Sequence, residues 1–137
     1  MIRPNLRMDA EANTCLRFGV LLLASGASGY RVIRAVKRCA RSLGFDNADV
    51  IVGFNTISCT FHRGEQFRTA VADVPLPGVN ASRIEALETA AHSLLQSYRT
   101  PEVISTALDE IERIPSPRWG LRLSTLAAGL ACAGFAI

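Results

Sequence analysis

Few side chains in this sequence could carry out acid–base or nucleophilic chemistry, because its only histidines are His62 and His92. A hydrolytic site needs a nucleophile beside a base, and Cys59 with His62 is the most suggestive such pair. In a regular strand, however, side chains three residues apart point to opposite faces. We therefore expect His62 to be a polar histidine near a strand end, not half of a catalytic pair.

A second candidate group surrounds His92, with Glu88 four residues before it and Glu85 one turn further back. Positions four apart share one face of a helix, so this set could bind a metal or relay a proton. Solvated helix faces commonly carry the same combination of residues. We favour that simpler interpretation for His92.

The cysteines lack the paired spacing of a zinc site, and we expect reduced thiols, three of them on buried apolar faces. They are Cys15, Cys39, Cys59 and Cys132. With no nucleophile–base pair and no cluster of ligands, the sequence predicts no catalytic, cofactor-binding or metal-binding residue. We expect a protein that is not an enzyme and that has no cofactor.

Two features could bind anions. The first is a basic cluster in one segment, spaced to share roughly one face of a helix: Arg31, Arg34, Lys37, Arg38 and Arg41. It is either a solvated face or a surface for phosphates or anionic lipid headgroups. The net charge of +3 is small and no aromatic residues interleave, so nucleic acid is not an expected partner. The second feature, residues 26–29, is better explained as a tight turn between helices.

Apolar residues recur at helical spacing in four segments that must position these groups. The first runs from about residue 9 to 25, and the second is capped by Ser28 and ended by Gly44. Asn80 caps a third, whose apolar stripe extends to Tyr98. Thr100, followed by proline, begins a fourth with Val103 on its inner face.

Between the second and third helices the period changes to two, which indicates strands. Val50, Val52 and Phe54 alternate first, and residues 57–62 alternate next. A turn at residues 63–65, in which Gly64 takes a positive φ, leads to a returning strand at 67–74.

We therefore predict an α+β fold, in which a mainly antiparallel sheet of about three strands packs with four amphipathic helices. Hydrophobic residues make up 49% of the 137 and charged residues 20%, which excludes a disordered chain. The expected organisation is a cytoplasmic domain at 1–114, followed by a proline-bracketed linker and a truncated first transmembrane helix at 115–137.

The uncharged run at 123–137 supports that last prediction. As a helix it would reach roughly 22 Å, whereas a bilayer core is about 30 Å thick. Arg113, Arg118 and Arg122 precede it, and Trp119 stands where an interfacial aromatic belongs. This pattern places the preceding domain in the cytoplasm.

The order of several short segments resembles the N-terminal region of the threonine/serine exporter family of bacterial inner-membrane proteins. The similar segments are residues 19–27, 30–32, 40–44, 78–80 with Arg83, 109–112, 117–119 and 126–131. The individual motif positions are Gly26, Ala27, Tyr30, Arg31, Gly44, Asn80, Arg83, Pro117 and Trp119. Around Ile33 and Arg34 the relatives tend to carry acidic residues instead.

The resemblance implies a cytoplasmic domain that precedes a bundle of transmembrane helices and takes part in export of small amino acids or related organic acids. One incomplete helix cannot line a transport pathway, so we expect the chain not to transport alone. Expected partners are the family's transmembrane bundle, in cis or as a separate subunit, membrane lipid and a second copy of the chain. The alternative is a soluble regulatory or binding module that recognises an anionic ligand or a partner protein.

Overall fold

The computed structural model of the chain describes residues 5–75 and 78–115. Within them the elements follow in the order α1 (Leu6–Ala24), α2 (Gly29–Ser42), β1 (Asn47–Val52), β2 (Thr56–Arg63), β3 (Gln66–Asp73), α3 (Ala81–Ser93), the short 3-10 helix η1 (Leu94–Gln96) and α4 (Pro101–Glu112). The prediction of an α+β fold with four helices and a three-stranded antiparallel sheet is confirmed.

Local residue chemistry explains where the helices begin and end. The side chains of Asn80 and Thr100 accept hydrogen bonds from the third residue beyond them, as predicted for helix caps. Gly44 ends α2 at a φ of +85°, which glycine adopts without strain. Ser28 occupies the N-cap position directly before α2, as predicted. Its side chain, however, makes no capping hydrogen bond.

The sheet has the order β1–β2–β3, and both pairs are antiparallel. The turn between β2 and β3 has two central residues, and Gly64 takes the predicted positive φ, at +58°. Ile57, Cys59 and Phe61 of β2 are fully buried and alternate with more exposed neighbours. The sheet therefore has one covered face, as the alternation predicted.

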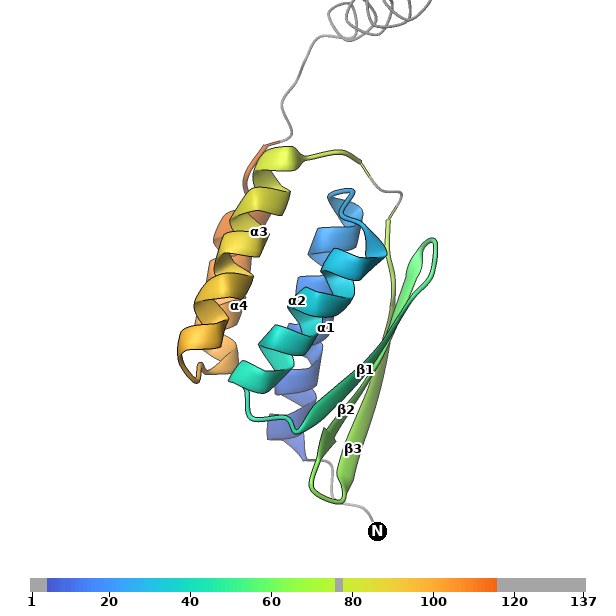
Figure 1. Cartoon of the computed structure of the whole chain (residues 1–137), viewed down its shortest axis with the longest axis vertical. Coiled ribbons are helices and arrows are strands. Elements are labelled where there is room, and N and C mark those ends of the chain that lie inside the picture. The colour runs from blue at the N-terminus through green and yellow to red at the C-terminus, as the bar shows by residue number, and fades with distance from the viewer. Residues whose placement is uncertain (1–4, 76–77, 116–137) are drawn as a thin grey trace, which may run out of the picture.

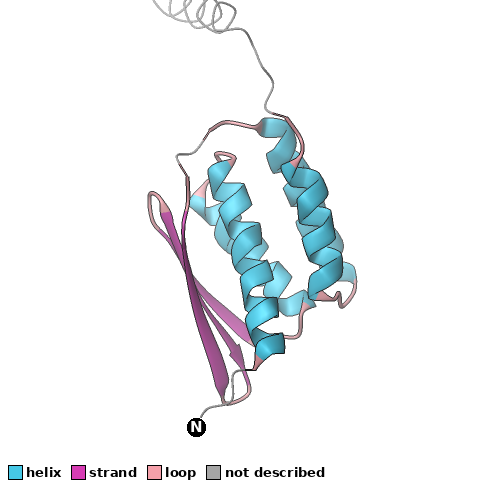
Figure 2. Cartoon of the chain, turned by 180° about the vertical axis from the view of Figure 1, so that it is seen from behind, coloured by secondary structure: helices cyan, strands magenta, loops and turns pink. Residues whose placement is uncertain are grey.

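The helices form two layers on that covered face (Figures 1 and 2). α1 and α2 lie directly against the strands, and α3 and α4 pack on α1 and α2 from the other side. A Cβ added at Gly19 of α1 would lie 2.8 Å from Cγ2 of Val36 in α2, so glycine permits this close helix approach. The middle helices are thus buried from both sides.

Three expected apolar contacts were wrong, two of them because regular structure ends earlier than the pattern suggested. Phe54 is 83% exposed, since Gly53 donates to the carbonyl of Thr56 and closes a turn that ends β1. Tyr98 is 84% exposed because α3 stops at Ser93. Val103, in the first turn of α4, is 52% exposed and is not part of the core.

The predicted transmembrane segment at 115–137 lies, apart from Pro115, outside the described residues. Among the helices that the structure describes, none is long and apolar enough to cross a bilayer.

Candidate functional site

The motif position Gly26 closes the turn between α1 and α2. Its φ is +91°, and the amide of the next residue, Ala27, donates back to the carbonyl of Leu22 at 3.1 Å. Ala27 is buried beneath the turn. A helix that ends in this way requires a residue without a Cβ at the positive φ, which accounts for the glycine.

The connection from β3 to α3 runs beside this turn. The amide of Gly78 donates to the carbonyl of Ala24 at 3.1 Å, and the amide of Asn80 donates to the carbonyl of Ser25 at 3.0 Å. A Cβ at Gly26 would come within 2.9 Å of the carbonyl oxygen of Gly78. The two backbone segments therefore touch with no room for a side chain.

Asn80 and Arg83 extend this contact to the end of α4. The buried side chain of Asn80 accepts from the amide of Arg83 and donates to the carbonyl of Ile114 at 3.4 Å. Nη2 of Arg83 donates to the carbonyls of Glu112 at 2.9 Å and Ile114 at 3.0 Å. A cation here also opposes the partial negative charge at the end of a helix.

We call this set the junction: Gly26, Gly78, Asn80, Arg83 and Ile114. It joins the α1–α2 turn, the start of α3 and the end of α4 at one end of the domain, the end from which the chain continues beyond Pro115 (Figure 1). The structure thus brings together four of the motif positions, Gly26, Ala27, Asn80 and Arg83. They make main-chain and buried polar contacts that hold the three segments together.

The other motif positions lie apart from the junction. Tyr30 is 71% exposed beneath the guanidinium of Arg34, and Arg31 pairs with Glu88 at 3.4 Å. Gly44 lies at the far end of α2. Pro117 and Trp119 lie outside the described residues.

In the part of the chain that the structure describes, the groups considered for catalysis lie apart or pair with other residues. Cys59 is buried on the inner face of β2, whereas His62 is partly exposed and pairs with Asp49 at 3.0 Å, so the expected separation of the pair is confirmed. Glu88 pairs with an arginine of α2. Among the described residues no group of three potential ligands could hold a metal.

The described cysteines are free and buried, as expected: Cys15, Cys39 and Cys59. Burial raises the pKa of the Cys15 thiol, and contact with Cys39 raises it further. Burial also raises the pKa of Cys59, to about 12. The thiolate is the nucleophilic form, and a raised pKa leaves these two thiols protonated at neutral pH. Cys132 lies outside the described residues.

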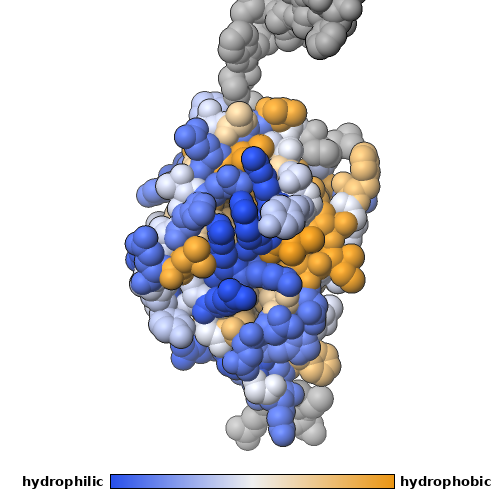
Figure 3. All heavy atoms as spheres, viewed as in Figure 1, coloured by the Kyte–Doolittle hydropathy of each residue, from blue (hydrophilic) through white to orange (hydrophobic). Residues whose placement is uncertain are grey.

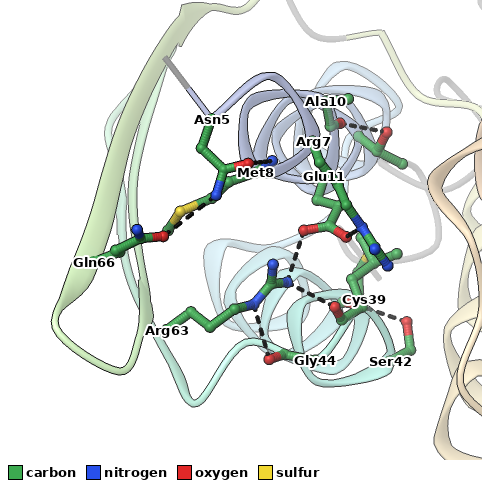
Figure 4. A network of polar contacts seen from close by, with 12 residues as sticks. Asn5, Arg7, Met8, Ala10, Glu11, Cys39, Ser42, Gly44, Arg63 and Gln66 are labelled. Carbon is green, nitrogen blue, oxygen red and sulfur yellow. Dashed lines mark hydrogen bonds and ion pairs between the residues drawn. The ribbon is translucent and has the colours of Figure 1, made fainter. Parts of the chain in front are cut away.

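The sequence interpretation missed a buried carboxylate, Glu11, which lies beside the guanidinium of Arg63 (Figure 4). Glu11 of α1 is 2% exposed and forms ion pairs with Nη2 of Arg63 at 2.7 Å and with Nε of Arg7 at 3.1 Å. Arg63 also donates to the carbonyls of Leu43 and Gly44 and so covers the end of α2. A signal was present, because Glu11 lies four residues before buried Cys15 on the apolar stripe.

Comparison with known proteins assigns the family. The model of the ThrE family, described as "Putative threonine/serine exporter", matches residues 13–137. "Probable succinate transporter subunit YjjP" of Escherichia coli (strain K12) is 27% identical over 129 residues, which cover 92% of this chain and 48% of that protein. The chain thus spans about half the length of this curated relative. No solved structure matches. The family match covers most of the described domain, and the chain therefore belongs to the threonine/serine exporter family.

Proposed function

We propose that this chain is the cytoplasmic N-terminal portion of an inner-membrane exporter of small amino acids, of the threonine or serine kind, or of related organic acids. The observation that carries the proposal is the family match, because it spans both the folded domain and the apolar residues after it. The family description favours threonine and serine, and the name of the bacterial relative favours a dicarboxylate.

Transport in this proposal needs further membrane-spanning helices. A solute pathway through a bilayer is lined by several helices that satisfy one another's polar groups. The relative that extends beyond the matched region is named as a subunit, which supports a partner in the membrane. We propose that these helices come either from the same polypeptide or from a separate subunit, and that residues 115–137 contribute the first of them.

The junction gives the domain its role in this arrangement. Arg83 holds the last residue of α4, and Asn80 and Arg83 both hold Ile114 just beyond it, directly before Pro115. A domain attached through a flexible end would pass little force to membrane helices. Attachment through hydrogen bonds from α3 allows a shift of the helical layer to be passed on to the membrane part. We propose this as the means by which the domain assembles or gates the pathway.

The orientation follows from charge. Arg113, Arg118 and Arg122 flank the apolar run, and basic residues beside a span favour the cytoplasmic side. We therefore place residues 1–114 in the cytoplasm and the protein in the bacterial inner membrane.

Membrane fractionation followed by limited proteolysis tests this proposal. We expect the full chain to stay with the membrane after a carbonate wash. In inverted inner-membrane vesicles, whose cytoplasmic face is outward, an added protease should cut the domain; in intact spheroplasts it should not. A periplasmic marker protein supplies the control for vesicle orientation. Release of the chain by carbonate, or cleavage in intact spheroplasts, would contradict the proposal.

A further inference from the structure

An open groove lies at the end of the domain far from the junction. It is formed between the C-terminal half of α2 and the segment that follows α3, and its volume is about 410 Å³. Arg38 and Arg41 line one side, and Leu94, Leu95, Gln96 and Tyr98 line the other. The amide of Arg99 donates to the carbonyl of Ser42 at 3.1 Å, which ties the two sides together.

The groove carries positive charge that no described acid neutralises. Arg38 and Arg41, one turn apart on α2, form no ion pair with any residue in the described ranges, and neither do Arg34 and Lys37. By contrast, Arg31 of the same helix pairs with Glu88. Figure 3 shows the resulting strongly hydrophilic band over α2. Guanidinium groups without partners favour an anion beside them.

The negative end of a helix normally disfavours an anion near its last turn. In this protein Arg63 donates to the carbonyls of Leu43 and Gly44, immediately beyond α2. These hydrogen bonds occupy carbonyl groups at that end, while the charge of Arg63 itself is paired with Glu11.

The composition of the groove selects among anions. Its lining contains no aspartate or glutamate, so the ammonium group of an amino acid would lie beside two guanidinium groups without a counter-charge. The two arginines match the two negative charges of a dicarboxylate, whereas a monocarboxylate such as acetate supplies only one charge. Leu94 and Leu95 offer apolar surface to a short carbon chain, and the hydroxyl of Tyr98 and the amide of Gln96 offer further hydrogen bonds.

We propose that this groove binds a small doubly charged carboxylate, with Arg38 and Arg41 holding its oxygens. The groove lies at the end of the domain far from the junction, and binding there would make the state of the domain depend on the dicarboxylate concentration around it. The inference does not rest on the exporter role, because binding to the domain is measured without transport.

Isothermal titration calorimetry of the full chain in a non-ionic detergent tests the proposal, with succinate, acetate and L-threonine as probes at low ionic strength. We expect succinate to bind, and acetate and threonine to bind at least about fivefold more weakly. Absence of heat from succinate, or threonine binding as tightly as succinate, would overturn the proposal.

Matched variants locate the site. Arg38→Gln and Arg41→Gln should each weaken succinate binding by at least about fivefold. Arg34→Gln removes the same charge from the same helix but outside the groove, and it should change the affinity by less than about twofold, through long-range electrostatics alone. Equal losses from all three variants would show that diffuse charge is responsible, and the groove proposal would fail.

A last experiment uses phosphatidylglycerol vesicles, because lipid phosphates, like carboxylates, offer negatively charged oxygens to arginine. The proposal predicts that succinate binds in the absence of vesicles. If the chain instead sediments with these vesicles, succinate gives no heat, and Arg34→Gln weakens sedimentation as much as Arg38→Gln does, then the basic helix recognises a lipid surface and the proposal is wrong.

Discussion

Arg83 holds the end of α4 by donating from Nη2 to the main-chain carbonyl of Ile114 at 3.0 Å. The two residues are 31 positions apart in the sequence, yet they join the first turn of α3 to the last described turn of the domain. Since the described part of the chain ends at Pro115, directly after Ile114, this bond holds the last described residues against α3.

Loss of this contact should loosen the end of α4. We expect Arg83→Gln to lower the free energy of unfolding by about 1–2 kcal/mol, because hydrogen bonds from a charged donor to two carbonyls are lost. Hydrogen–deuterium exchange of residues 109–114 should rise by more than that of β2. Arg113→Gln is the control, since its exposed side chain makes no ion pair with the described residues. Equal exchange in the two variants would contradict the assignment.

Substitution of Gly26 tests the close backbone contact within the junction. Gly26→Ala places a Cβ 2.9 Å from the carbonyl oxygen of Gly78 at a φ of +91°. Gly44→Ala also has a positive φ, but its nearest neighbour is the end of the Arg63 side chain at 4.0 Å. We expect a loss of about 1 kcal/mol at Gly44 and clearly more at Gly26, measured by urea unfolding. Similar losses at both glycines would show that the Gly78 contact is unimportant.

The buried Glu11 should be important for stability, and its two arginine partners should differ. Glu11→Ala leaves Arg63 without its anion, and we expect it to cost about 2–4 kcal/mol. Arg7 is 84% exposed at its side chain, so Arg7→Gln should cost less than about 1 kcal/mol. Urea unfolding of the two variants gives the comparison. A loss in Arg7→Gln as large as that in Glu11→Ala would contradict the buried pairing with Arg63.

The buried thiols should make the domain less stable in alkali. The pKa of Cys59 is about 12 in the fold, against an ordinary value of 9.0. The folded thiol keeps its proton where the unfolded one loses it, so its stabilising contribution is complete below pH 9 and declines as pH rises toward about 12. Between about pH 8 and pH 10 this group should cost about 1.4 kcal/mol of unfolding free energy. Cys59→Ala should reduce the loss by that amount; an unchanged loss would be inconsistent with the raised pKa.

Much of the fold was predictable because its signals are local. Asn80, Thr100 and Gly44 end or begin helices through their own chemistry, and the alternation in residues 57–62 directly predicted the buried face of β2. Phe54 and Tyr98 were misplaced because hydrophobic periodicity continues past the residue at which the backbone turns. Sequence pattern alone does not indicate that end point.

The candidate site was harder to predict because its contacts join residues that are far apart in the sequence. Arg83 and Ile114, or Glu11 and Arg63, meet only when the layers pack, and no spacing rule relates them. The resemblance identified Gly26, Asn80 and Arg83 without a role, and the structure supplies their common location. Glu11 was overlooked because its partner Arg63 lies far away in the sequence, and its place on the buried face of α1 was the only local signal.

The efflux of labelled threonine, serine and succinate from preloaded cells tests the central claim most directly. Cells of the native organism that lack the gene for this chain are compared with the same cells after the intact gene is restored. The account predicts that at least one of the three solutes leaves the deleted cells severalfold more slowly, and that restoration of the gene recovers the original rate. Equal efflux of all three solutes with and without the gene would contradict a role in export.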